Sequence, residues 1–290
     1  MRDAPILYRT LHAALPLIVN PYLQLDIEGQ ENVPAAGGAV VASNHLAFID
    51  SVLLALNLDR PVYFLGKADY FASAKTRWFF SGVGVIPTYR QGGDKARESL
   101  ESGLSVVSRG DLLGIYPEGT RSPDGRLYRG KTGPVRIAIE GEVPLVPCAV
   151  IGTREAQPPD AYMPRRRPVK VRYGRPLDFS RYSGQEDDTA ILRSATDELM
   201  YEIMLLSGQE YVDEYAANIK SGQVTVEGVE GEHAPQVGEE PPGLATEGRR
   251  EGGRESRLAT EGRREGGRES RLATEGRREG GRGIWRRRAS

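Results

Sequence analysis

Short apolar runs alternate with amphipathic helical patterns over the first 220 residues, and this alternation constrains the fold more than any other feature. Seven runs have the length of buried strands, at 23–28, 39–42, 62–65, 83–86, 112–116, 145–151 and 169–173. Helical patterns fall between or after them, at 49–58, 68–80, 94–108, 132–140 and 186–206. Such alternation is typical of a mostly parallel sheet covered by helices. We therefore predict an α/β domain over residues 23–220, with functional side chains in the loops beyond the strand ends.

Residues 1–22 carry an apolar stripe with helical spacing. Its members are Leu7, Leu11, Leu15, Ile18 and Tyr22, which recur at steps of three or four. A membrane span needs about 20 apolar residues, and Pro16 interrupts the longest apolar run, so neither a transmembrane helix nor a signal peptide is predicted. The stripe suits an amphipathic helix that docks on the core or one that lies at a membrane interface. The pattern alone slightly favours the core.

The last 70 residues differ from the rest in composition. An acidic block at 221–243 precedes a basic segment in which "LATEGRREGGRESR" begins at Leu244, repeats unchanged at Leu258 and starts again at Leu272. With so few apolar residues to bury, residues 221–290 are predicted to be disordered. Their arginines could attract anionic lipid or nucleic acid, but the interleaved glutamates weaken that attraction. We expect no nucleic-acid partner.

The single cysteine and the three histidines exclude two classes of site. Cys148 lies within the apolar run 145–151 and is interpreted as a small buried hydrophobic residue, and no disulfide can form within the chain. His12, His45 and His233 are scattered, so no metal site is predicted.

A polar group, Ser43-Asn44-His45, follows the run 39–42, and Asp50 comes five residues after the histidine. Five helical steps would place these two side chains about 140° apart. They can meet only if His45 lies in the turn before the helix and Asp50 lies in its first turns. A carboxylate on one imidazole nitrogen makes the other nitrogen a better base. The alternative is that the residues only satisfy the turn, and on spacing alone that alternative is favoured.

Cations follow three other predicted strands. Lys67 follows the run 62–65, Arg90 follows 83–86, and Arg121 lies in "PEGTRS", residues 117–122. Each alone suits an ordinary surface, but together they could bind an anionic headgroup. In the same loop Gly119 permits close backbone approach, and Thr120 offers a hydroxyl. The chain has no G-x-S-x-G motif for a serine nucleophile and no P-loop.

Four blocks in order resemble the glycerolipid acyltransferase family typified by 1-acylglycerol-3-phosphate acyltransferase. The blocks are "NHLAFID" at 44–50, "GVIPTYR" at 84–90, "YPEGTRS" at 116–122 and "VPLVPCA" at 143–149. Tyr116 stands where the family usually has Phe, and Cys148 stands where Val or Ile is common. The resemblance covers roughly residues 25–175, and the C-terminal repeats have no counterpart in it.

The resemblance implies roles for individual residues. His45 would deprotonate the glycerol hydroxyl and Asp50 would orient His45, so that the hydroxyl attacks the acyl thioester directly. The residues implied to bind the glycerol phosphate are Arg90, Glu118, Gly119, Thr120 and Arg121, with Lys67 as a further contact. No metal or cofactor is implied, and the acyl donor would be acyl-CoA or acyl-carrier protein.

The implied reaction acylates the sn-2 hydroxyl of 1-acyl-sn-glycerol-3-phosphate and gives phosphatidic acid in phospholipid biosynthesis. Such a protein is expected to be cytoplasmic and peripheral on the inner face of the plasma membrane, with the segment 1–22 meeting the membrane surface. Another lysolipid or glycerol 3-phosphate could be the acceptor, and a non-catalytic lipid-binding protein is the rival class. Intact His45 and Asp50 favour an enzyme. The sequence defines no oligomeric state.

Overall fold

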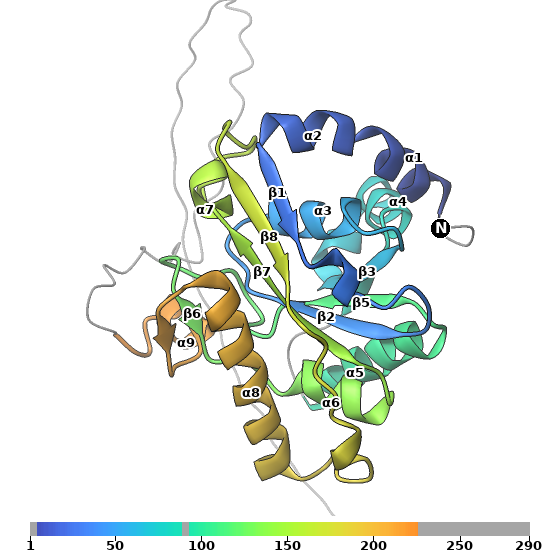
Figure 1. The fold of residues 1–290 in the computed structure, drawn as a ribbon, viewed down its shortest axis with the longest axis vertical. Helices are drawn as coiled ribbons and strands as arrows, with labels where there is room; N and C mark the ends of the chain where they lie inside the picture. The colour runs from blue at the N-terminus through green and yellow to red at the C-terminus, as the bar shows by residue number, and fades with distance from the viewer. Residues whose placement is uncertain (1–4, 89–92, 226–290) are drawn as a thin grey trace, which may run out of the picture. The chain divides into compact units, whose positions relative to one another are not determined.

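The computed structural model describes residues 5–88 and 93–225. Its main sheet has seven strands in the order β1-β8-β7-β2-β5-β3-β4 (Figure 1). Their bounds are β1 (Leu25–Glu28), β2 (Ala39–Ser43), β3 (Val62–Lys67), β4 (Val85–Thr88), β5 (Leu112–Ile115), β7 (Leu145–Ile151) and β8 (Val169–Tyr173). Every predicted strand is present, and the α/β fold class is confirmed. The predicted C-terminal segment of repeats and Arg90 lie outside the described residues.

Two strands run against the others. β8 pairs antiparallel with β7, with Ile151 at the end of β7 opposite Lys170 near the start of β8. β1 pairs parallel with β8, with Leu25 opposite Val169. The remaining pairs are parallel. β1 and β8 therefore begin at the edge of the sheet where the five parallel strands end.

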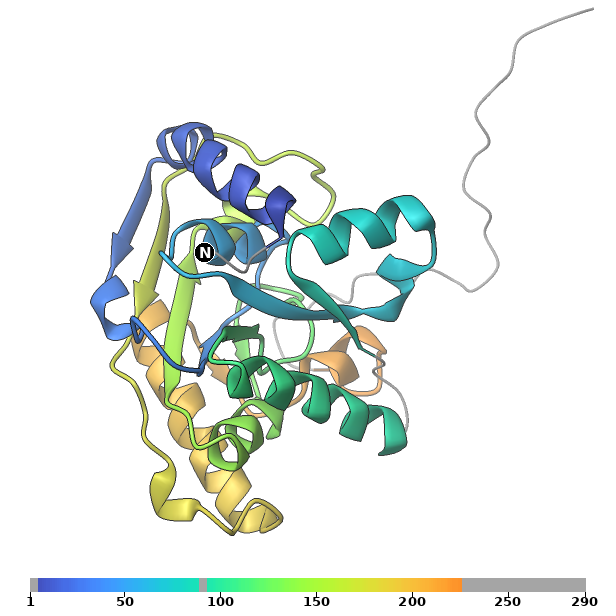
Figure 2. The same ribbon diagram turned by 90° about the vertical axis from the view of Figure 1, so that its right-hand side faces the viewer.

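Helices cover both faces of the sheet (Figures 1 and 2). The bounds are α1 (Ile6–Ala14), α2 (Pro16–Tyr22), α3 (Ile49–Leu56), α4 (Ala74–Gly82), α5 (Gly93–Ser108), α6 (Gly133–Glu140), α7 (Thr153–Ala156), α8 (Thr189–Ser207) and α9 (Ala216–Lys220). β2 is buried throughout because both of its faces are covered. Ala39 and Val41 pack in the cluster that includes α3, whereas Val40 and Ala42 pack with α5, α6 and α8.

The N-terminal segment forms two helices rather than the single predicted one. α1 ends before Leu15, and Pro16 begins α2, where its missing N–H costs no helical hydrogen bond. Ile18 and Tyr22 of the apolar stripe, in α2, are exposed, whereas Leu7, Leu11 and Leu15 are partly buried. Within the described residues no helix is long and apolar enough to cross a membrane.

A second, two-stranded sheet joins distant parts of the chain. β6 (Leu127–Tyr128) pairs parallel with β9 (Tyr211–Val212), and α9 packs against them through Ala216 and Ile219. The sequence did not predict these elements, because strands of two residues carry no measurable periodicity.

Candidate active site

The turn between β2 and α3 brings His45 and Asp50 together. Asp50 lies in the first turn of α3 and is fully buried. Its Oδ2 accepts hydrogen bonds from His45 Nδ1 (2.9 Å) and from the backbone N–H groups of Leu46 (2.7 Å) and Ala47 (2.8 Å). The carboxylate thus ties the turn and also orients the imidazole. With Nδ1 engaged, Nε2 is the nitrogen left to accept a proton.

Asn44 fixes the start of this turn. Its side chain is buried and pairs with both backbone groups of Val150 in β7, accepting from N at 2.8 Å and donating to O at 3.0 Å. It also donates to Gln209 Oε1 at 2.6 Å. Asn44 therefore anchors the residue before the histidine to the neighbouring strand.

The loop after β5 holds the backbone of His45 from two sides. Glu118 Oε1 accepts from His45 N (3.1 Å), and Ser122 N donates to His45 O (2.7 Å). The other carboxylate oxygen, Oε2, accepts from Tyr128 N in β6 (3.1 Å). Burial raises the pKa of Glu118 to about 8, against the opposing effect of the two N–H groups, and nearby Asp50 raises it further.

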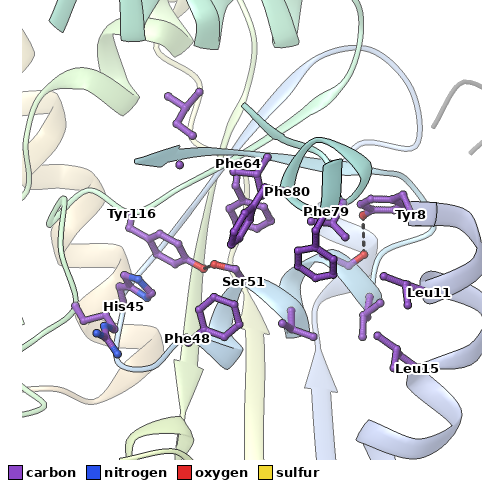
Figure 3. Close-up of a pocket in the computed structure, with 18 residues that line it drawn as sticks. Tyr8, Leu11, Leu15, His45, Phe48, Ser51, Phe64, Phe79, Phe80 and Tyr116 are labelled. Carbon is purple, nitrogen blue, oxygen red and sulfur yellow. Dashed lines mark hydrogen bonds between the residues drawn. The ribbon is translucent and has the colours of Figure 1, made fainter. Parts of the chain in front are cut away.

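Tyr116 stacks on the imidazole of His45. The ring centroids are 3.8 Å apart with an interplanar angle of 11°. The Tyr116 hydroxyl lies 2.7 Å from Ser51 Oγ on α3, so the ring is tied to the helix that carries Asp50. Figure 3 shows this hydroxyl pair on the wall between His45 and Phe64. Burial raises the pKa of Tyr116 well above its usual value, so the stacked ring is neutral.

Gly119 and Thr120 meet two lysines. Gly119 has φ +72°, and an added Cβ would lie 3.1 Å from the Lys131 side chain. Lys220 at the end of α9 donates to Thr120 Oγ1 at 3.3 Å. Arg121 follows, exposed, and contributes to the same opening as His45. Positive charge therefore surrounds the loop that follows β5.

An apolar pocket of about 300 Å³ extends from the histidine. His45 and Arg121 line it together with side chains from α1, α3, α4, β3 and β4. Aromatic and leucine side chains make up most of its wall, as Figure 3 shows for Phe48, Phe64, Phe79, Phe80, Leu11 and Leu15. The geometry thus combines an oriented base and a cation with a cavity suited to a hydrocarbon chain.

Part of the sequence is similar to known acyltransferases. The family model described as Acyltransferase matches residues 24–151. A chloroplastic 1-acyl-sn-glycerol-3-phosphate acyltransferase of Brassica napus is 35% identical over 141 residues, which are 48% of this chain and 41% of that protein. The 1-acyl-sn-glycerol-3-phosphate acyltransferase of Bacillus subtilis (strain 168) is 27% identical over 185 residues, 62% of this chain and 88% of that protein. Residues 24–151 therefore match the acyltransferase family.

A solved structure shows the same fold. The crystal structure of the 1-acyl-sn-glycerophosphate (LPA) acyltransferase PlsC from Thermotoga maritima matches with a TM-score of 0.50 and 20% identity, over 69% of this chain and 82% of that one. The chain spans less than half the length of the chloroplastic relatives, 41% for Brassica napus and 39% for Arabidopsis thaliana.

The residues expected at the site differ in where they lie. His45 and Arg121 line one opening, and Asp50 holds the imidazole of His45. Gly119 and Thr120 directly precede Arg121 in the same loop, where Thr120 accepts a hydrogen bond from Lys220. Glu118 departs from its expected contact with phosphate. It is 1% exposed and both of its oxygens accept backbone N–H groups, so it holds the His45 turn instead.

Two expected cations have no described side chain. Lys67 ends β3 and pairs with Thr88 of β4, so its backbone lies at the edge of the sheet where the five parallel strands end. Its side chain and the whole of Arg90 lie outside the described residues. Asn44, Ser51, Lys131 and Lys220 were not predicted as site residues. The only sequence signal for Ser51 is Tyr116, whose hydroxyl needs a partner where the family usually has Phe. The sequence holds no such signal for Lys131 or Lys220.

Proposed function

We propose that this acyltransferase transfers a fatty acyl group from an acyl thioester to the sn-2 hydroxyl of 1-acyl-sn-glycerol-3-phosphate, giving phosphatidic acid for phospholipid biosynthesis. The observation that supports this most directly is the His45–Asp50 pair at the mouth of an apolar pocket, beside Arg121. The names of the relatives, which are 1-acyl-sn-glycerol-3-phosphate acyltransferases, supply the acceptor.

The geometry supports the following reaction. His45 Nε2 takes the proton of the acceptor hydroxyl while that oxygen attacks the thioester carbonyl carbon. The tetrahedral intermediate then expels the thiolate, which takes the proton back from the imidazolium. Asp50 stabilises the imidazolium through Nδ1, and the face of Tyr116 lies against the same ring. Arg121 binds the acceptor phosphate, and the apolar pocket holds an acyl chain.

The donor and location form part of the same proposal. The donor is acyl-CoA or acyl-carrier protein, and the acceptor alcohol is itself the nucleophile, so these residues need no metal or prosthetic group for the steps above. The protein works as a peripheral enzyme on the inner face of the plasma membrane, with α1 and α2 meeting the lipid. The exposed Leu17 and Ile18 of α2 support that contact.

The test uses the full chain in detergent with oleoyl-CoA and 1-oleoyl-glycerol 3-phosphate, and thiol release is followed over time. The His45→Ala variant should lose activity by about 10²–10⁴-fold, the usual contribution of a general base. His12→Ala is the matched control. His12 lies in α1, its Nε2 is 2.8 Å from Leu58 O, and its side chain does not line the pocket. Equal activity of wild type and His45→Ala would refute the mechanism. Thiol release only with glycerol 3-phosphate or another lysolipid would replace the acceptor.

A further inference from the structure

The loop between α7 and β8, residues 157–168, exposes an unusual set of side chains. Tyr162 and Met163 are 98% and 77% exposed. Three consecutive arginines, Arg165, Arg166 and Arg167, follow them and are also exposed. Over residues 5–88 and 93–225, no ion pair involves any of the three. Asp160 is the one acidic residue within the loop.

The loop is held by hydrogen bonds at both ends, so its exposure does not come from a lack of attachment. Arg165 N donates to Ala156 O at 2.6 Å, which closes the loop at its base. The buried Gln157 donates through Nε2 to Tyr162 O (3.2 Å) and accepts through Oε1 from Ile49 N (2.9 Å), the first residue of α3. The exposed tip is therefore connected to the helix that carries Asp50.

α2 lies beside this loop and exposes apolar side chains of its own. The Tyr22 hydroxyl donates to Pro164 O at 3.1 Å. Leu17 and Ile18 are 78% and 68% exposed. Because β1 and β8 pair in parallel, α2 before β1 and the loop before β8 reach the same edge of the sheet (Figure 1). We name the combined patch the α2–loop surface. It consists of Leu17, Ile18, Tyr22, Tyr162, Met163, Arg165, Arg166 and Arg167.

We propose that the α2–loop surface binds bilayers that contain anionic lipids. Apolar side chains from two separate elements, gathered in one exposed patch, are uncommon on proteins that remain in water. Tyrosine and aliphatic side chains suit the region between headgroups and acyl chains. The arginines beside them match the phosphates of anionic headgroups in charge and geometry. The arginine loop thus adds a charge-selective contact that the N-terminal helices alone do not supply.

The test measures binding of the full-length protein to sedimented vesicles. One set is pure phosphatidylcholine and the other also contains phosphatidylglycerol. Wild type should bind the anionic set more tightly, and added salt should weaken that binding. The triple variant Arg165→Ala/Arg166→Ala/Arg167→Ala should bind anionic vesicles up to about 100-fold more weakly, since each arginine near an anionic surface contributes about fivefold.

A matched variant removes the same charge elsewhere. Arg97, Arg175 and Arg181 are exposed residues on α5, after β8 and near α8, and none belongs to the α2–loop surface. Their combined replacement by alanine should leave vesicle binding close to that of wild type. The double variant Tyr162→Ser/Met163→Ser should weaken binding to both vesicle sets. An arginine-loop variant that binds as wild type does, or a control variant that loses as much, would overturn the proposal.

The readout does not depend on the acyltransferase activity, so the two proposals can fail separately. An inactive protein that still shows arginine-dependent vesicle binding would overturn only the proposed function. An acidic acyl-carrier protein is the other chemical class that could recognise these arginines. If the arginine-loop variant bound vesicles normally and lost turnover only with acyl-carrier-protein donors, the surface would be a protein-docking site and the lipid assignment would be wrong.

Discussion

Two buried carboxylates hold the His45 turn, and they act on different atoms. Asp50 bonds the imidazole and two backbone N–H groups within the turn itself. Glu118 bonds the backbone N–H of His45 and that of Tyr128 in a different sheet. Glu118 is therefore a positioning residue, and because its side chain is 1% exposed it is not available to a phosphate.

The buried Glu118 should make the stability of the protein depend on pH. Its pKa is about 8 in the folded chain against 4.5 as the reference value. The folded state thus binds this proton more tightly, and the free energy of unfolding should fall as pH rises between these values. The slope is at most about 1.4 kcal/mol per pH unit, or roughly 2–3 kcal/mol from pH 6 to pH 8. Denaturant unfolding of wild type and Glu118→Gln at both pH values measures it.

The Glu118→Gln variant has no proton to lose at this position, so it serves as the reference for the wild type. The difference in stability between the two proteins should shift in favour of the variant as pH rises. Parallel pH dependence in the two proteins would show that Glu118 is already ionised in the folded state at pH 6.

At the scale of residues, the resemblance implied the His45–Asp50 contact that the structure shows, whereas the spacing alone favoured a turn without it, and neither predicted the role of Glu118. The first contact lies within a six-residue segment, and simple helix geometry limits how it can form. The role of Glu118 depends on Tyr128, in a two-residue strand that exists because β9 pairs with it. No local pattern reports a pairing between residues so far apart in the chain.

At the scale of elements, Tyr8 connects α1 to the rest of the domain. Its hydroxyl donates to Ala55 O (2.8 Å) near the end of α3 and accepts from Val62 N (3.0 Å) at the start of β3. Burial raises the pKa of Tyr8 to about 12, so it remains a donor at all ordinary pH values. One side chain thus sets the position of the helix that forms one wall of the apolar pocket.

The Tyr8→Phe variant should be less stable by about 1–3 kcal/mol, because two buried backbone groups lose their partner. Tyr201→Phe on the exposed side of α8 is the control and should change stability by less than about 0.5 kcal/mol. Both are measured by denaturant unfolding. Equal stability of Tyr8→Phe and wild type would show that water replaces the lost hydroxyl.

The sequence predicted the strands better than the way they are arranged. Apolar runs mark where a strand forms, and all seven lie where expected. The reversed direction of β8 cannot be predicted in this way, because the apolar pattern of a buried strand is the same whether the strand runs parallel or antiparallel to its neighbour. The apolar stripe of the N-terminal segment continues past Pro16, although the helix does not.

At the scale of the whole molecule, the last element that the structure describes, α9, packs back onto the domain. α9 packs with β6 and β9 through Tyr128, Val212, Ala216 and Ile219. A chain truncated after Val237 should therefore keep the thermal unfolding midpoint and the turnover number of the full chain. Thermal unfolding and thiol release, measured on both chains, check this. A loss of turnover at an unchanged unfolding midpoint would assign the C-terminal repeats a part in catalysis.

The reversal of β1 and β8 has a consequence for how a lipid would reach His45 under the proposed function. Five strands bring the loops that follow them to one edge of the sheet, and two bring the segments that precede them. The His45 turn and the surface proposed to contact lipid therefore share that edge. A lysolipid could then diffuse in the plane of its own leaflet to the reacting histidine, and the product could return to that leaflet without crossing water. Under the proposed function, the reversed direction of β1 and β8 lets the acceptor lipid react without first leaving the bilayer.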